Sequence, residues 1–182
     1  MPFSLPYPGG STTSLQVCSN GFVSTSSNGT AWNPSVTDLL TDATRWCPMW
    51  HDLSPNQGGS GDVHYNANSS RVVITWNGVE YYNSNSTATF QIQFWANGDV
   101  HCIYQSVASG GNDYLVGFSL GNGAADPGTR AMVPRLVDEA VGLGHELIKP
   151  SARIINCARG GLIDDDDSDS DDDTNSEDDD IG

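Results

Sequence analysis

Apolar and polar residues alternate along much of the first 120 positions, with the two-residue period of β-strands. The clearest case is residues 87–95, where Phe90, Ile92 and Phe94 alternate with Thr and Gln residues. Because successive side chains of a strand point to opposite faces, this pattern predicts one buried face and one wet face. A turn at residues 96–99 follows, and residues 100–105 are predicted to return antiparallel to the first strand.

The same signals occur in other parts of the chain. An Asn-Gly pair between short apolar runs is a strong hairpin signal, and it occurs at Asn20 and Gly21. The flanking runs of other turns are rich in β-branched and aromatic residues, which favour strands. The sequence therefore predicts an all-β fold, either an antiparallel β-sandwich or an open barrel. Further strands are predicted at residues 15–18, 22–24, 62–66, 70–76 and 114–120.

Three segments depart from this pattern. Residues 31–44 contain a short helix candidate, and residues 136–147 have an approximately helical apolar face, which a strand at residues 152–157 follows. From Asp164 onward the acidic run cannot bury apolar surface and repels itself, so it is predicted to be disordered. We therefore expect an all-β module at residues 1–127, a helix–strand appendage at residues 128–163 and a disordered acidic tail at residues 164–182.

The net charge of −16 is concentrated in the predicted tail. Residues 164–180 hold 12 acidic residues and no basic one, which leaves 11 acidic and 7 basic residues elsewhere, a net charge of −4. The rest of the chain has no basic patch of the kind that nucleic-acid binding needs, so no nucleic-acid partner is predicted. No stretch approaches the roughly 20 apolar residues of a membrane helix, so no membrane insertion is predicted.

Four cysteines occur, and none belongs to a CxxC pair. No His lies at zinc-finger spacing, so a structural zinc site is not predicted. Two interpretations remain for the three cysteines of the β-rich region: one disulfide with one thiol left over, or buried reduced thiols that pack as small apolar side chains. These residues are Cys18, Cys47 and Cys102.

Six short motifs follow one another over residues 3–120. They are FSLPYPGG at 3–10, VCSNGFV at 17–23, WHDLSP at 50–55, GDVHY at 61–65, VVITW at 72–76 and FQIQFWANGDV at 90–100. In order and spacing this region resembles the nidogen-type extracellular domains and related bacterial secreted modules. The resemblance implies a non-catalytic adhesive or matrix-binding part of a larger extracellular or cell-surface protein, with a glycan or a protein as its partner. Residues 1–6 have neither the basic start nor the apolar run of a secretory signal.

A second, shorter resemblance covers the segment KPSARIINCARGGLID at residues 149–164. It is similar to a signature of the D-isomer-specific 2-hydroxyacid dehydrogenases, of the phosphoglycerate dehydrogenase type. That resemblance implies that Arg159 holds a substrate carboxylate, for which a guanidinium fork is well suited. The Gly142-Leu143-Gly144 stretch lacks the third glycine of a dinucleotide fingerprint, and no strand leads into it. We therefore interpret the segment as an inactive fragment that does not bind NAD.

The five tryptophans are numerous for this length. Trp50, Trp76 and Trp95 have apolar neighbours at strand positions, so we expect them in the core. Trp32 and Trp46 bracket the irregular region and are the predicted ligand-binding residues, because exposed tryptophans are common interaction hot spots.

Oxygen-bearing side chains near the Gly-rich loops make calcium the candidate metal. They lack the regular spacing of a twelve-residue calcium loop. The pairs His51-Asp52 and Asp62/His64 are interpreted as surface or loop features, so no catalytic residue is predicted. The candidate calcium ligands are Asp52, Asn56, Asp62 and Asn66.

Three sequons for N-glycosylation begin at Asn28, Asn68 and Asn85, all in predicted turns. Three functional hypotheses result. The first is a binding or adhesion module, and the second is a fragment of an NAD-dependent dehydrogenase. The third is a structural subunit that self-associates in a surface assembly, with the acidic tail as a solubilising brush.

Overall fold

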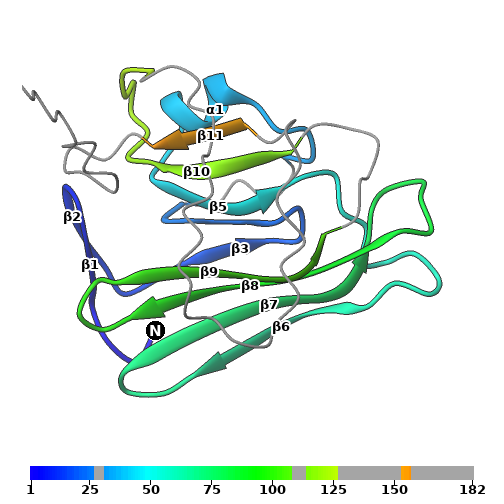
Figure 1. The fold of residues 1–182 in the computed structure, drawn as a ribbon. Coiled ribbons are helices and arrows are strands. Elements are labelled where there is room, and N and C mark those ends of the chain that lie inside the picture. Colours follow the sequence, from blue (N-terminus) through cyan, green and yellow to red (C-terminus); the bar gives the residue numbers. More distant parts are fainter. Residues whose placement is uncertain (27–30, 108–113, 127–152, 157–182) are drawn as a thin grey trace, which may run out of the picture.

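The computed structural model describes residues 1–26, 31–107 and 114–126, together with the backbone of residues 153–156. Within these residues two β-sheets lie over one another, and a small hairpin lies at one end of them (Figure 1). The hairpin pairs β1 (Leu5–Tyr7) with β2 (Gly10–Thr12). The arrangement is a β-sandwich, because each sheet keeps its own edges instead of closing into a barrel.

The four-stranded sheet is a continuous antiparallel meander in the order β6-β7-β8-β9. Its strands are long, and three consecutive turns connect them, as the alternating sequence pattern predicts. The inward side chains of β7 and β8 are fully buried, whereas their outward neighbours are at least partly exposed, apart from Gln93 at 9% exposed. Each strand therefore has one apolar, dry face and one more polar face. The strands are β6 (Asp62–Ala67), β7 (Arg71–Glu80), β8 (Thr87–Trp95) and β9 (Val100–Val107).

The five-stranded sheet has the order β11-β10-β5-β4-β3 and joins segments that are distant in sequence. Its neighbours pair antiparallel, except that β11 runs parallel to β10. Figure 1 shows this sheet above the four-stranded one, with the helix α1 (Val36–Thr41) on its far side. The strands are β3 (Gln16–Cys18), β4 (Phe22–Ser24), β5 (Arg45–Trp50), β10 (Leu115–Ser119) and β11 (Arg153–Asn156).

The main core fills the space between the two sheets. Trp76 of β7 stacks on Phe90 of β8, with ring centroids 4.8 Å apart, and Trp46 of β5 meets the Phe94 ring edge-on at 5.3 Å. Burying large aromatic rings in this way contributes both apolar area and specific ring geometry. The members that come from the two sheets include Val23, Trp46, Met49, Val72, Ile74, Trp76, Phe90, Ile92 and Phe94.

A second apolar cluster lies on the other side of the five-stranded sheet, under α1. Leu39 and Leu40 are the buried residues of this helix, and they pack against Trp50 of β5 and Phe22 of β4. The helix begins at the N-cap Ser35, whose Oγ accepts a hydrogen bond from the Asp38 amide at 3.1 Å. Because one cluster lies on each side of it, β5 is buried at all six residues.

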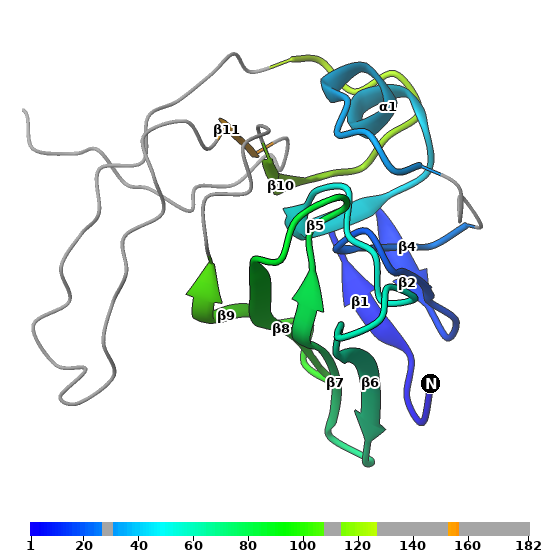
Figure 2. The ribbon, with the colours of Figure 1, turned by 90° about the vertical axis from the view of Figure 1, so that its right-hand side faces the viewer.

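Two aromatic side chains join the layers through hydrogen bonds to the opposite backbone. Trp76 Nε1 of the four-stranded sheet donates to the Ser19 carbonyl at 2.9 Å, in the β3–β4 turn. Tyr104 of β9 donates from its hydroxyl to the Pro48 carbonyl of β5 at 2.6 Å. Figure 2, which views the molecule from the side, shows the two layers that these bonds connect.

The predicted all-β fold is confirmed, and so are the hairpins β3–β4 around Asn20, β6–β7 and β8–β9. The short helix within residues 31–44 and a strand within residues 152–157 are also confirmed. The sequence analysis did not predict the β1–β2 hairpin or the strand β5. The predicted helix at residues 136–147 and the predicted disordered tail lie outside the described residues, and the three-unit division stays a prediction.

Candidate functional site

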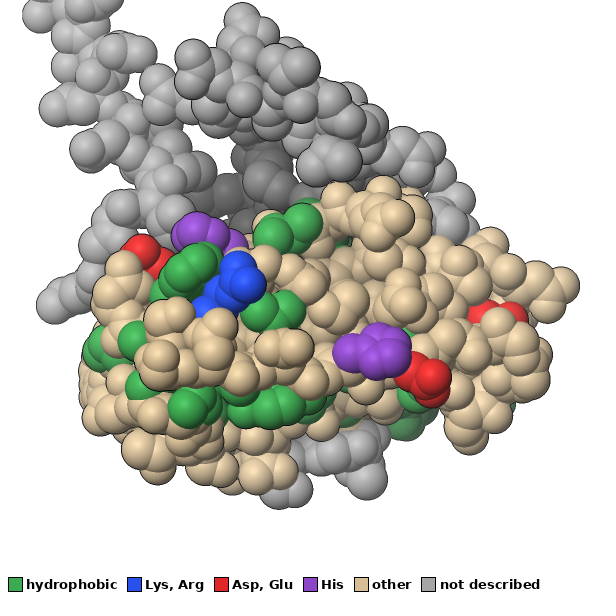
Figure 3. All heavy atoms as spheres, turned by 90° about the horizontal axis from the view of Figure 1, so that it is seen from below, with side chains coloured by type: hydrophobic (Ala, Val, Ile, Leu, Met, Phe, Trp, Pro, Cys, Tyr) green, Lys and Arg blue, Asp and Glu red, His purple; other side chains and the backbone are tan. Residues whose placement is uncertain are grey.

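The face of the four-stranded sheet that points away from the core carries the candidate site; we call it the outer face. It lies at the bottom of Figure 1, and Figure 3 views it directly. In that view it is mostly polar, with one basic side chain beside small apolar patches. Strand pairing places the following residues on it: His64 and Asn66 of β6; Arg71, Val73 and Thr75 of β7; Gln91, Gln93 and Trp95 of β8; and His101 and Ile103 of β9.

A chain of side-chain hydrogen bonds crosses the centre of the outer face. Arg71 Nη1 donates to Gln93 Oε1 at 3.3 Å, and Gln93 Nε2 donates to Gln91 Oε1. Gln91 Nε2 in turn donates to Thr75 Oγ1 at 2.7 Å. Linked donors and acceptors polarise and hold one another, so the amide groups are oriented before any ligand arrives. We call these four residues the polar ladder.

An arginine–tryptophan contact lies at one end of the polar ladder. Arg71 and Trp95 are direct partners across β7 and β8, and the Arg71 guanidinium carbon lies 5.0 Å from the Trp95 ring centroid. The His101 ring lies 6.0 Å from the same indole. Trp95 Nε1 is buried and has no hydrogen-bond partner. This end of the face therefore combines a cation and an aromatic ring, with the indole N–H turned away from solvent.

The chemistry of the outer face suits recognition. Glutamine amides can each donate and accept, and arginine offers several donors in one plane. Among the described residues, no group of three or more His, Cys, Asp or Glu is placed to hold a metal ion. The arrangement can therefore bind a ligand through hydrogen bonds and ring contacts.

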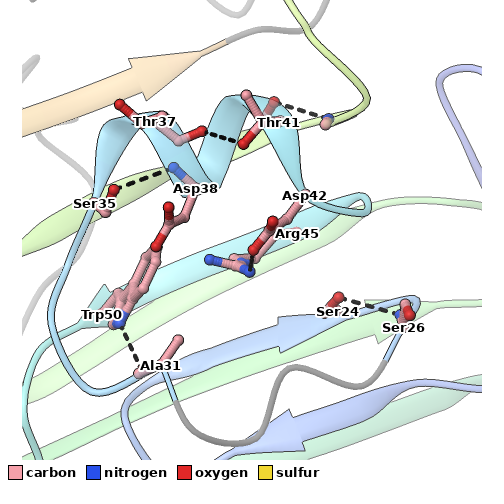
Figure 4. Close-up of polar contacts among 12 residues, drawn as sticks. Ser24, Ser26, Ala31, Ser35, Thr37, Asp38, Thr41, Asp42, Arg45 and Trp50 are labelled. Atoms are coloured by element: carbon pink, nitrogen blue, oxygen red, sulfur yellow. Dashed lines mark hydrogen bonds and ion pairs between the residues drawn. The ribbon is translucent and has the colours of Figure 1, made fainter.

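A second arginine–aromatic cluster belongs to the five-stranded sheet and is closed to ligands. Arg45 has no exposed surface, and its guanidinium carbon lies 4.5 Å from the ring centroids of both Phe22 and Trp50. Its Nη2 donates to Asp42 Oδ2 at 2.7 Å, beneath α1 (Figure 4). Arg45 Nε and Nη1 have no hydrogen-bond partner. Because the cluster is sealed by the helix, Arg45 has a structural role.

The tryptophans are distributed differently from the sequence prediction. Trp50 and Trp76 are fully buried, as expected, and Trp32 is 59% exposed. Trp46 is only 5% exposed and packs between the sheets, so its assignment to a ligand surface was wrong. Trp95 was expected in the core, but it lies on the outer face. It is adjacent to the inward-pointing Phe94, and adjacent side chains of a strand point to opposite faces.

The predicted calcium ligands do not form one site. Asp62 and Asn66 lie four residues apart on the same strand, about 13 Å along it, whereas calcium ligands bind within roughly 2.3–2.6 Å of the ion. The Asn56 side-chain oxygen accepts a hydrogen bond from the Ser54 hydroxyl at 2.8 Å. Burial raises the pKa of the Asp52 carboxyl, and the neighbouring His51 opposes this rise. The four-residue calcium site is therefore corrected: Asp62 and Asn66 cannot share an ion.

His51 is buried against aromatic rings. Its ring meets Tyr81 edge-on at 4.7 Å, and its Nδ1 lies 3.1 Å from the carbonyl oxygen of Asp52. The adjacent carboxylate is thus not the group that His51 contacts. In contrast, Asp62 and His64 share the outer face, as their spacing predicts.

The cysteines of the described region are free. Cys18 and Cys47 are buried in the cluster under α1, where desolvation raises the pKa of both thiols. These two residues follow the second interpretation, buried thiols acting as small apolar side chains. Cys102 is exposed on β9.

The glycosylation sequons stay predictions. Asn68 is exposed in the β6–β7 turn, where its Oδ1 accepts hydrogen bonds from Ser70 and Arg71. Asn85 is also exposed, between β7 and β8. Asn28 lies outside the described residues, and so does Arg159 of the dehydrogenase-like segment.

Most residues of the outer face were missed by the sequence analysis. The two-residue period of β8 is a signal that identifies Gln91, Gln93 and Trp95 as residues of one face, because they alternate with the apolar residues that point inward. No local signal identifies Arg71 as their partner, since it lies on a different strand and reaches them only through the pairing register.

The two sheets define the chain's described region as an all-β module. The model of the NIDO-related family matches residues 1–135, and the chain belongs to this family. The match confirms the nidogen-type resemblance. No curated protein and no solved structure matches the chain.

The family assignment also bears on the rival hypotheses. The NIDO-related family is not a known enzyme family. The match ends before residue 149, and no finding supports the dehydrogenase resemblance of residues 149–164. Within the part of the chain that the structure describes, no helix has the length and apolar character needed to cross a membrane.

Proposed function

We propose that this chain is a non-catalytic adhesion module of a secreted or cell-surface protein, and that it binds glycans through the outer face. The observation that carries this proposal is the polar ladder of Arg71, Gln93, Gln91 and Thr75, which ends beside Trp95. Membership in the NIDO-related family supports the extracellular setting.

The ladder favours a glycan because its groups match those of a sugar. Sugar hydroxyls donate and accept hydrogen bonds, as the amides of Gln91 and Gln93 do. A flat ligand can lie along the pleated face and exchange water for these groups at several points. Since the ladder is already hydrogen-bonded and packed on a sheet, little conformational entropy is lost on binding.

A protein ligand fits the outer face less well. The buried centre of a protein interface is enriched in apolar and aromatic residues. Among the described residues of this face, Ile103, at 45% exposed, is the one large hydrophobic side chain in the exposed class. A protein partner would therefore find little apolar surface to bury on the outer face.

Binding of the full chain to an array of immobilised neutral and uronate-bearing oligosaccharides tests the proposal. We expect saturable binding that weakens at least about tenfold in the double variant Gln91→Ala/Gln93→Ala, because two hydrogen bonds contribute about 1 kcal/mol each. Gln16→Ala is the matched control, since Gln16 is an exposed glutamine on β3 of the other sheet.

Three results would contradict the proposal. Absence of any retained oligosaccharide rules out the glycan ligand. Equal loss of binding in the Gln16→Ala control, or no loss in the double variant, rules out the outer face as the glycan-binding surface. If the double variant instead abolishes binding to an immobilised matrix protein, the face is a protein-binding surface.

A further inference from the structure

The edge of the five-stranded sheet at β10 is a second candidate binding surface, and it is separate from the outer face. β10 (Leu115–Ser119) pairs with β5 on one side. On its other side it pairs in parallel with β11, in the register Leu115 to Arg153 through Phe118 to Asn156. Figures 1 and 2 both show β11 alongside β10 at this edge.

β11 comes from outside the family module. The NIDO-related match ends at residue 135, before β11 begins at Arg153. Without β11, β10 would be the edge strand of the module, with a row of unpaired N–H and C=O groups. The structure therefore shows a module edge that is covered by an added strand of the same chain.

The sequence of β10 makes such an edge reactive toward other strands. Natural edge strands are protected by charged residues, prolines or bulges that discourage pairing. β10 reads Leu-Val-Gly-Phe-Ser, with no charged residue and no proline. Its register against β5 shifts between Leu115 and Gly117, but its register on the β11 side is unbroken from Leu115 to Phe118. An uncovered β10 is thus a ready template for an extended peptide.

The sequence of β11 and the length of its connection to the module both suit pairing with β10. β11 reads Arg-Ile-Ile-Asn, and two consecutive β-branched residues favour an extended strand. Residues 127–152 connect it to the module, and a parallel return requires a connection of about a dozen residues or more. A connection of this length keeps the segment at a high effective concentration near β10 while allowing it to leave.

We propose that the β10 edge is a strand-docking site whose occupant is residues 153–156 of the same chain. The site accepts an extended segment with β-branched residues at its centre, and it binds that segment through backbone hydrogen bonds in parallel register. The chain's own segment competes with any such peptide that is added from outside.

A variant that removes the backbone donors of β11 tests this directly. Adjacent N–H groups of a strand point in opposite directions, so one of Ile154 and Ile155 directs its N–H toward β10. Proline has no N–H, and the double variant Ile154→Pro/Ile155→Pro therefore removes that donor whichever of the two residues supplies it. The probe is a fluorescent peptide of residues 150–158 with Cys157→Ser, added to the full chain. We expect saturable binding to the variant and at least about tenfold weaker binding to the unmodified chain, in which the site is occupied.

Two controls make the result specific. The full chain with Ser168→Pro/Asp169→Pro carries the same two prolines outside β11, and it should behave as the unmodified chain. The probe peptide with the two isoleucines replaced by proline should not bind. Equal binding of the original probe to the unmodified chain and to the Ile154→Pro/Ile155→Pro variant, or no binding to either, overturns the proposal.

Hydrogen exchange gives a second, independent readout. In the Ile154→Pro/Ile155→Pro variant, amides within Leu115–Ser119 that face β11 should exchange at least about tenfold faster. Amides of β7 and β8 should keep their protection, which shows that the variant is folded. Unchanged exchange in β10 overturns the proposal even if the peptide experiment is ambiguous.

Discussion

The four-stranded and five-stranded sheets share one core, but their second faces differ. The second face of the five-stranded sheet is covered by α1 and the cluster around Trp50, so β5 is buried along its whole length. The second face of the four-stranded sheet is the outer face, where Arg71, Thr75 and Gln91 of the polar ladder are partly exposed and Gln93 is 9% exposed. A sheet that is covered twice is structural, whereas a sheet that is covered once has a face free for recognition.

The two arginines whose side chains are described show the same contrast. Arg45 and Arg71 both lie over a tryptophan ring, at 4.5 Å and 5.0 Å. Arg45 is sealed under α1 and paired with Asp42, while Arg71 is half-buried on the outer face. The same pair of side chains therefore stabilises one sheet and offers binding groups on the other.

The largest expected effect separates the two faces of a single strand. Trp76→Ala removes a fully buried ring that stacks on Phe90 and donates to the Ser19 carbonyl, so the free energy of unfolding should fall by about 3–5 kcal/mol. Thr75→Ala, one residue earlier on the outer face, should cost about 1 kcal/mol or less. Urea unfolding followed by tryptophan fluorescence measures both. Similar losses would show that the outer face is part of the core.

The next effect compares two glycines with left-handed backbone conformations. Gly21 in the β3–β4 turn has φ +82°, and a Cβ there would lie 1.8 Å from the Met49 carbonyl oxygen; Gly78 in β7 has φ +64° and open space around it. Gly21→Ala should cost about 3 kcal/mol or more, since backbone strain and overpacking add. Gly78→Ala should cost only about 1 kcal/mol, from backbone strain alone. Thermal unfolding by circular dichroism distinguishes them, and equal shifts would mean that the crowding at Gly21 relaxes freely.

The smallest effect concerns pH and belongs to the five-stranded sheet, which holds both buried thiols. Burial raises the pKa of Cys18 and Cys47, whereas an unfolded cysteine titrates at about 8.5. Above that pH the unfolded chain releases protons that the folded chain retains, so the free energy of unfolding should fall as pH rises. The slope is at most about 1.4 kcal/mol per pH unit for each thiol. Urea unfolding under reducing conditions at pH 7.5 and 9.5 should show a smaller fall in Cys47→Ala than in the unmodified chain. An equal fall in both would contradict this origin of the pH dependence.

The same contrast explains which parts were predictable from sequence. The four-stranded sheet has one wet face, so Phe90, Ile92 and Phe94 alternate visibly with polar residues. β5 has no wet face, and its Arg-Trp-Cys-Pro-Met-Trp sequence shows no two-residue period, so neither the strand nor the burial of Trp46 was predicted. Its burial depends on α1, which directly precedes it in the chain, and on β10, which comes from a distant segment.

The candidate site was less predictable than the fold. Its residues lie on β7 and β8, and they meet only because the register sets Arg71 opposite Trp95 and Thr75 opposite Gln91. The alternation along residues 87–95 places Trp95 on the same face as Gln91 and Gln93, but its apolar character favoured a core assignment. The pairing register of β7 with β8 shifts between Trp76 and Val79, and no local sequence pattern predicts this shift.

The bonds of Trp76 to the Ser19 carbonyl and of Tyr104 to the Pro48 carbonyl have a mechanical consequence. Apolar contact between two sheets has no preferred direction, so the sheets could slide over one another at little cost. A hydrogen bond weakens steeply once its atoms move out of line. These two links therefore resist sliding, because shear between the layers has to break directional bonds as well as apolar contacts.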